Sequence, residues 1–150
     1  MNKVPQNKIN WGRNLWNILH FITTRYDTSL RKDYEVFFTK IVPIILTCKK
    51  CSDNYKNHIK QLKIDLSSRE ALVFWLYKIH NRTNRNLNKE EYPFEKFNDK
   101  LKNYNYFKRT ASNSTTTYIV YMQKHLKCDN LKLKIAFSKF ISFIFSQCAF

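Results

Sequence analysis

Two cysteines separated by two lysines, Cys48 and Cys51, are the side chains in this sequence best suited to chemistry. They stand where a helix is expected to begin. A thiolate at the N-terminus of a helix is stabilised by the helix dipole, and Lys49 and Lys50 add positive potential beside it. Because a lowered thiol pKa favours thiol–disulfide exchange, this CxxC pair predicts a redox site or a metal site.

Three kinds of site compete for the pair. A structural zinc site needs four ligands, but the sequence has neither a second CxxC nor a His pair at zinc-finger spacing, and His58 is a lone candidate. A thioredoxin-type site needs a βαβ setting, which the sequence does not suggest. A flavin-linked redox pair needs instead a pocket for a large aromatic cofactor beside the cysteines.

Polar and aromatic residues on two expected helices would form such a pocket. They share helical faces and are Arg13, Trp16 and His20 on the first helix, and His80, Asn81 and Asn84 on a later one. Flat rings can sandwich a ring system, amides can bond its edges, and cations can meet phosphates. Taken singly, Trp16 could equally be a core aromatic and His80 an interhelical histidine.

The elements that must position these residues are expected to be helices. The chain has a single glycine and three prolines, whereas sheets and phosphate-binding loops depend on glycine turns. We therefore expect an all-α protein, a four-helix bundle with a short fifth helix and a helical C-terminal extension. Residues 1–10 would be a flexible N-terminus, residues 11–102 the bundle, and residues 103–150 a linker and the extension.

Apolar periodicity and capping residues place the helices of the bundle. Pro43 falls inside the second helical pattern, so a kink or an early stop is expected there. Thr47 is expected to cap the third helix, and Ser67 with Glu70 forms a capping box before the fourth. The expected helices of the bundle cover about residues 11–25, 33–46, 48–62, 68–87 and 94–101.

The C-terminal third is harder to interpret. Residues 103–117 are rich in Asn, Ser and Thr, which indicates a loop or linker. Residues 118–127 are ambiguous, because β-branched residues precede a helical step. Asp129 or Asn130 would cap a last helix that places Cys148 on its apolar face.

Three motifs, in this order along the chain, resemble the ERV/ALR family of FAD-dependent sulfhydryl oxidases. WGRNLWNILH at residues 11–20 is similar to the family's W-G-R-x-x-W-x-x-L-H opening, and the CxxC follows an apolar helix. IHNRTNRNLNK at residues 79–89 is similar to the H-N-x-V-N-x-x-L-x-K stretch, with Thr83 where valine is usual. Lys96 matches a lysine seen after that motif. The resemblance covers about residues 11–101.

The resemblance implies an enzyme that forms disulfides in protein substrates and passes the electrons through the CxxC pair and FAD to O2, giving H2O2. Cys48 would exchange with incoming dithiols and Cys51 would face the flavin. A protein dithiol or a thioredoxin-like protein would be the substrate, and the enzyme would be a head-to-tail homodimer without a metal. The residues implied to contact FAD are Gly12, Arg13, Trp16, His20, His80, Asn81, Asn84, Lys89 and Lys96.

Two departures from the family's pattern stand out. The structural disulfide that ties the bundle of some members has no cysteines here, and Asn54 stands where viral members often have histidine. Members without that disulfide include those of large DNA viruses, so a viral-type member is expected. No secretory signal and no membrane span are expected, which suggests an intracellular location. This would be the cytoplasm or a viral factory for a viral protein, or the mitochondrial intermembrane space for a cellular one.

The net charge of +16 supports an alternative function. A non-enzymatic basic helical protein would bind nucleic acid or an acidic partner, and its CxxC would be structural or hold zinc. A third possibility is an oxidase-like scaffold that has lost the flavin. The basic residues are scattered rather than grouped in long runs, so no specific nucleic-acid binding is expected.

Two further cysteines, Cys128 and Cys148, lie outside the region of resemblance. They would be a shuttle pair, a structural disulfide or free buried thiols. Burial of Cys148 on an apolar helical face would raise its pKa and make it a poor nucleophile. We therefore expect neither to be required for oxidation of a small dithiol.

Overall fold

The computed structural model describes residues 10–127 and 129–150 of the chain. Within these ranges every regular element is a helix, which confirms the all-α class. A 3₁₀ turn at Thr28–Leu30 and a π-helical stretch at Phe37–Ile41 accompany the α-helices. The α-helices are α1 (Trp11–Thr23), α2 (Arg31–Val36), α3 (Val42–Ile45), α4 (Lys49–Gln61), α5 (Arg69–Asn86), α6 (Phe94–Lys102), α7 (Tyr104–Leu126) and α8 (Leu131–Cys148).

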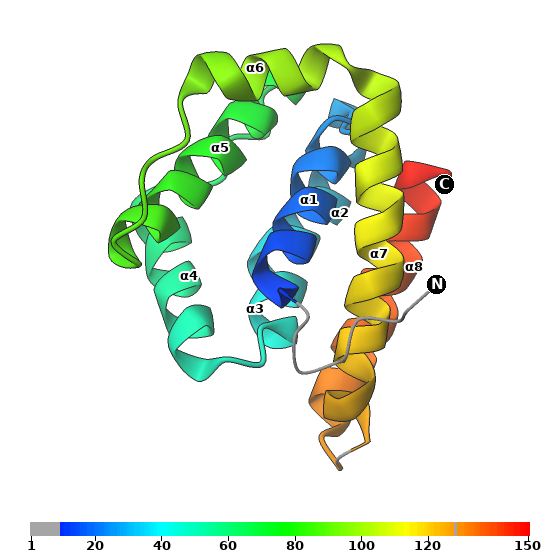
Figure 1. Cartoon of the computed structure of the whole chain (residues 1–150). Helices are drawn as coiled ribbons and strands as arrows, with labels where there is room; N and C mark the ends of the chain where they lie inside the picture. The colour runs from blue at the N-terminus through cyan, green and yellow to red at the C-terminus, as the bar shows by residue number, and fades with distance from the viewer. Residues whose placement is uncertain (1–9, 128) are drawn as a thin grey trace.

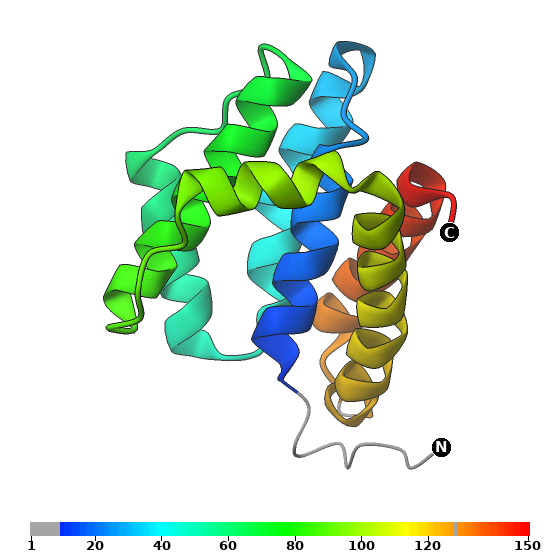
Figure 2. The same ribbon diagram turned by 45° about the horizontal axis from the view of Figure 1, so that its top comes forward.

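Helix α1 occupies the middle of the molecule. In Figure 1, α4 and α5 lie on one side of α1, α7 lies on the other, and α6 crosses above α1 to join the two sides. The turned view in Figure 2 shows that α7 and α8 form an antiparallel hairpin alongside α1. The expected flexible N-terminus lies outside the described residues except for Asn10, whose side chain caps α1.

Capping residues start α4 and α5 one position later than expected. The Sγ of Cys48, not Thr47, accepts the hydrogen bond from the backbone N–H of Cys51, at 3.2 Å. Ser68 caps α5 by accepting from the N–H of Ala71 at 3.0 Å. The hydroxyl of Ser67 is engaged elsewhere, because it donates to the Asp65 carboxylate at 2.6 Å.

The expected distortion near Pro43 takes the form of a π-helical stretch. The chain stays helical from α2 through Phe37–Ile41 into α3, and Pro43 occupies the first turn of α3. A proline inside a continuous helix has no N–H to donate, and its ring crowds the carbonyl four residues earlier, so the wider π-helical turn just before Pro43 is the local adjustment that accommodates it. Helix α3 ends soon afterwards at Ile45, where the chain turns toward the CxxC pair.

The expected linker at residues 103–117 is wrong, since these residues belong to α7. Asn103 caps this helix, and threonine hydroxyls along it donate to carbonyls four residues earlier, such as Thr115 to Ala111 at 2.8 Å. Residues Phe107, Ala111, Ser114 and Tyr118 recur at a helical spacing and are buried. Packing of this stripe along α1 outweighs the weak helix propensity of the Asn, Ser and Thr residues.

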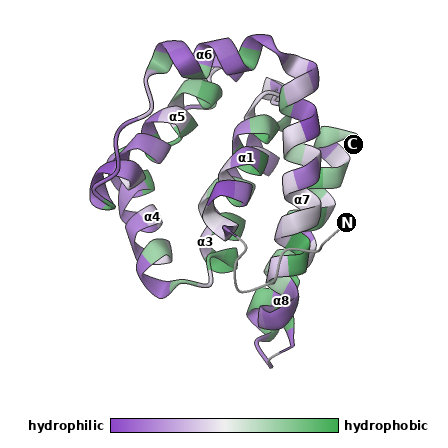
Figure 3. Cartoon of the chain, in the orientation of Figure 1, coloured by the Kyte–Doolittle hydropathy of each residue, from purple (hydrophilic) through white to green (hydrophobic). Residues whose placement is uncertain are grey.

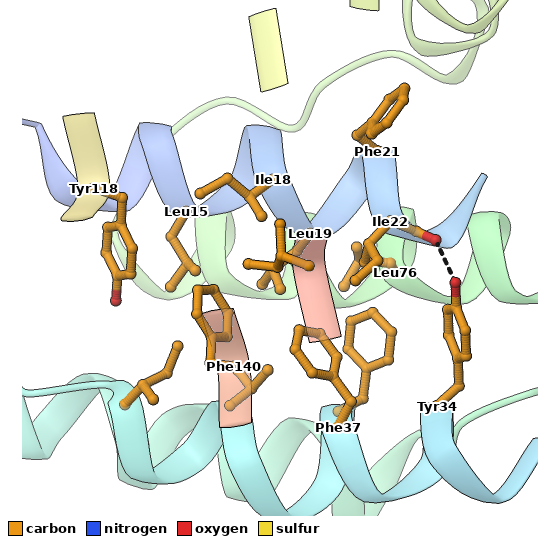
Figure 4. Close-up of a cluster of buried hydrophobic side chains, with 14 of the residues drawn as sticks. Leu15, Ile18, Leu19, Phe21, Ile22, Tyr34, Phe37, Leu76, Tyr118 and Phe140 are labelled. Carbon is orange, nitrogen blue, oxygen red and sulfur yellow. Dashed lines mark hydrogen bonds between the residues drawn. The ribbon is translucent and has the colours of Figure 1, made fainter. Parts of the chain in front are cut away.

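The core joins α1, the α2–α3 segment and the C-terminal hairpin. Figure 4 shows Phe140 of α8 beside Phe37, whose rings stack with centroids 5.5 Å apart. In the same view the buried hydroxyl of Tyr34 donates to the Ile22 carbonyl at 3.1 Å. The expected extension is therefore helical, and it completes the core on its side of α1.

Helices α4 and α6 contribute much less to this core. Both are largely hydrophilic in Figure 3, and α6 buries only Phe97. The buried residues of α4 are Ser52, Tyr55 and His58, two of which are markedly polar. The side of α1 that faces α4 and α5 is consequently incompletely filled. In the described part of the chain, no helix is both long enough and apolar enough to cross a membrane.

Candidate functional site

A cavity of about 660 Å³ lies between α1, α4 and α5. This volume falls within the range of roughly 300–1,000 Å³ that is usual for ligand sites. Residues after α5 and from α6 close part of its wall, among them Tyr92 and Phe97. All of the residues implied to contact FAD, except Lys96, line this cavity: Gly12, Arg13, Trp16, His20, His80, Asn81, Asn84 and Lys89.

The two cysteines of the CxxC motif form a disulfide at the start of α4. Their Cα atoms are 5.2 Å apart, and both side chains are half-buried. Cys51 lines the cavity, whereas Cys48 does not. The first turn of α4 is anchored to α3, since the Ser52 hydroxyl donates to the Pro43 carbonyl at 2.7 Å. Cys51 therefore forms part of the cavity wall, whereas Cys48 lies outside the cavity.

Stacked rings from α1 and α5 form another wall of the cavity. The rings of Trp16 and His80 are nearly parallel, at an angle of 7° and with centroids 4.0 Å apart. The Nε2 of His20 lies 2.9 Å from the Nδ1 of His80, so a single hydrogen links the two imidazoles. Phe97 of α6 contacts His20 with a centroid distance of 5.2 Å.

Both imidazoles are held in their neutral forms. Burial, together with the positive charges of Lys89 and Lys100, lowers the pKa of His80 to about 4. Burial also lowers the pKa of His20 well below its usual value, with smaller effects from His80 and Lys100. Among the described residues, the buried Nδ1 of His20 has no hydrogen-bond partner. Because His20 lines the cavity, a ligand bound there is a candidate partner for this atom.

The amide of Asn81 holds the segment after α5 in place. Its Nδ2 donates to the Tyr92 carbonyl at 3.2 Å, and its Oδ1 accepts from the Tyr92 N–H at 2.8 Å. Asn84 donates to the same Oδ1 at 3.3 Å. Asn81 lines the cavity, but in this structure its amide serves to position the neighbouring segment.

A tight reversal at the end of α5 brings Lys89 to the cavity. Asn88 adopts a left-handed backbone with φ of 55°, which asparagine tolerates better than most residues. The N–H of Lys89 then donates to the Asn84 carbonyl at 2.8 Å, and the N–H of Asn88 donates to the Arg85 carbonyl at 3.1 Å. These two bonds form a Schellman motif, which ends the helix.

Lys96 is the predicted residue that the structure does not bring to the cavity. Its side chain is exposed on α6, and Lys100, one turn further along, lines the cavity instead. Residues spaced by three, four or seven positions share a helical face, and this spacing from Lys96 is the sequence signal for Lys100. The same rule applied to Cys51 would have found Asn54 and His58, which also line the cavity.

A bundle with a CxxC disulfide beside a ring-lined cavity defines a helical thiol-redox protein with room for a large planar ligand. The chain belongs to the Erv1/Alr family, whose family model matches residues 13–105. No solved structure shows a significant match to the chain.

Curated relatives that match the chain come from plants, fungi and viruses. The FAD-linked sulfhydryl oxidase ERV1 of Arabidopsis thaliana is 29% identical over 96 residues, which cover 61% of this chain and 50% of that protein. The mitochondrial FAD-linked sulfhydryl oxidase ERV1 of Saccharomyces cerevisiae is 29% identical over 84 residues, which cover 54% of this chain and 44% of that protein. The 096R protein of Invertebrate iridescent virus 3, assigned by name to the same class, is 30% identical over 86 residues, which cover 54% of this chain and 58% of that protein. The chain spans about half the length of these relatives.

Proposed function

We propose that this protein is an FAD-dependent sulfhydryl oxidase, which forms disulfides in protein substrates and passes the electrons to O2, giving H2O2. The observation that carries the proposal is the Cys48–Cys51 disulfide, with Cys51 on the wall of a cavity lined by aromatic and imidazole rings. The names of the Arabidopsis and yeast relatives support the cofactor and the activity.

The chemistry of the cavity fits FAD. Its stacked Trp16 and His80 rings offer a flat surface to a planar ring system, and the unpartnered Nδ1 of His20 offers a hydrogen bond. Arg13 and Lys89 on the lining are exposed cations that suit a pyrophosphate. Gly12, Asn81 and Asn84 also line the cavity and stay predicted contacts, as does Lys96, which lies outside it.

The first chemical steps belong to the cysteine pair. A substrate thiolate attacks the Sγ of Cys48, the sulfur outside the cavity, and the Cys51 thiolate leaves. The second substrate thiol then attacks the substrate sulfur of this mixed disulfide and releases the Cys48 thiolate. The substrate has lost two electrons, which the pair has gained.

The position at the start of α4 stabilises the thiolate forms of the cysteines, which makes them good leaving groups and good nucleophiles. The Cys51 N–H already points at the Cys48 Sγ, and this contact stabilises a thiolate on Cys48. Bound FAD would supply a two-electron acceptor that returns the pair to its disulfide and passes the electrons to O2. The residues that line the cavity would hold that acceptor beside Cys51, and burial keeps the imidazoles of His20 and His80 neutral.

The wider assignments also stay proposals. The substrate would be a protein dithiol or a thioredoxin-like protein, and the enzyme would be a homodimer, which sedimentation of the purified protein would test. We also propose an intracellular location, which the mitochondrial yeast relative and the viral relatives support. It would be the cytoplasm or a viral factory for a viral protein, and the mitochondrial intermembrane space for a cellular one.

The visible spectrum and the oxygen uptake of the purified protein test the proposed function. We expect flavin absorbance and consumption of O2 with a small dithiol as reductant. Cys48→Ser and Cys51→Ser are expected to abolish oxygen uptake while FAD stays bound. A colourless protein that binds zinc would instead support the non-enzymatic alternative, and near-normal turnover of either serine variant would refute the redox role of the pair.

A further inference from the structure

His58 of α4 is a buried residue that lines the cavity and lies outside the three family motifs. It stands seven residues after Cys51, and residues at that spacing share a helical face. Both residues line the cavity, together with Asn54 between them. Only 6% of the surface of His58 is exposed. At a rise of about 1.5 Å per residue, His58 lies about 10 Å along α4 from Cys51.

One ring nitrogen of His58 has a partner and the other does not. Its Nε2 lies 2.9 Å from the side-chain Nδ2 of Asn86, at the end of α5. Its Nδ1 is buried, and no described residue offers it a hydrogen bond. Buried polar side-chain atoms are nearly always paired, so an unpartnered one on a residue that lines a cavity points to a ligand that completes it.

The contact with Asn86 determines which nitrogen carries the hydrogen. An amide Nδ2 can only donate, so the Nε2 of His58 must accept and cannot itself be protonated. A neutral imidazole then carries its hydrogen on Nδ1. Burial lowers the pKa of His58, and the positive charges of Arg82 and Arg85 lower it further, so the neutral form prevails near pH 7.

We propose that the Nδ1–H of His58 donates a hydrogen bond to an acceptor atom of the bound FAD, about 10 Å along α4 from the disulfide. The inference rests on the proposed function, because it requires FAD in this cavity. His58 is a binding residue that sets the affinity for the cofactor, and Asn86 is a positioning residue that fixes its tautomer. The acceptor is a carbonyl oxygen, a ring nitrogen or a phosphate oxygen, since each takes one N–H hydrogen bond.

The test measures the dissociation constant of FAD for the flavin-free protein, by flavin fluorescence at pH 7.5. Replacement His58→Phe keeps a flat ring and removes the donor, so we expect FAD to bind about tenfold more weakly. His58→Asn places an amide N–H near the position of Nδ1 and is expected to restore affinity to near that of the parent protein. His125→Phe on α7, outside the cavity, is the matched control and should not change affinity.

A second measurement does not depend on any variant. The ¹⁵N spectrum of the imidazoles in the parent protein is expected to show His58 protonated on Nδ1, with a resonance that shifts when FAD is added. Unchanged affinity in His58→Phe, or equally weak binding in His58→Asn and His58→Phe, would overturn the inference, as would an unprotonated Nδ1. A parent protein that does not bind FAD would overturn the proposed function itself, which is a separate and recognisable result.

Discussion

The low pKa of His80 predicts that the flavin-free protein loses stability between pH 7 and pH 5. The unfolded chain has a histidine with its ordinary pKa of 6.5, whereas burial and two lysines lower the pKa to about 4 in the fold. The unfolded chain therefore takes up a proton in this interval and the folded chain hardly does so. The stabilising effect is fully present above pH 6.5 and declines as the pH falls toward 4.

The expected size of the effect follows from these two pKa values. Linkage gives a loss of about 2 kcal/mol in the free energy of unfolding between pH 7 and pH 5, and about 3 kcal/mol by pH 4. His20 acts in the same direction, because its pKa is also lowered by burial. The interval above pH 5 is preferable for the measurement, since Asp27 and Asp65 have lowered pKa values and stay ionised there.

Urea unfolding followed by far-UV circular dichroism measures this loss in the parent protein and in His80→Gln. Flavin-free protein is required, because bound FAD would add a stabilisation of its own. The variant has no titrating group at this position, so its loss between pH 7 and pH 5 should be smaller by about 2 kcal/mol. Equal losses in the two proteins would show that the pKa of His80 is not depressed in the fold.

Three further predictions concern other parts of the chain. Phe140→Ala should lower the free energy of unfolding by about 3–5 kcal/mol, because it empties a fully buried site against Phe37, and a loss below 1 kcal/mol in urea unfolding would contradict the packing. The double variant Cys128→Ser, Cys148→Ser should oxidise a small dithiol at a near-normal rate, because burial raises the pKa of Cys148 to about 12 and makes its thiol a poor nucleophile. If the variant oxidises the small dithiol normally but fails to oxidise a protein thiol, the two cysteines form a shuttle. Nucleic acid should bind weakly and be released by added salt, whereas tight, sequence-selective binding at physiological salt would refute the proposal.

Features that depend on local residue types were predictable from the sequence. The cap of α8 at Asn130 is one example, because an asparagine side chain satisfies a free helical N–H wherever it precedes an apolar repeat. The CxxC pair is another, since its spacing alone brings two sulfurs within bonding reach. Cys148 is a free, buried thiol, which agrees with one of the three alternatives for the outer cysteines. Cys128 lies outside the described residues.

Features that depend on distant partners were not predictable. The helix at residues 104–126 exists because α1 offers a surface for its buried stripe, and no local signal carries that information. The unpaired Nδ1 atoms of His20 and His58 depend on how three helices leave a space between them. Asn81 was expected to contact a ligand, yet its amide is engaged by the Tyr92 backbone, eleven residues further along the chain.

Helix α1 forms a wall of the cavity with one face and packs against the C-terminal hairpin with another. Trp16 and His20 belong to the first face, and Trp11, which also lines the cavity, stacks on Tyr121 of α7 with centroids 6.2 Å apart. Any ligand that steadies α1 from the cavity side thereby steadies the surface on which α7 rests, and the reverse holds by reciprocity. Amide hydrogens of α7 beyond Phe107, the α7 residue that lines the cavity, should therefore exchange more slowly when the cavity is filled, although their residues do not line it.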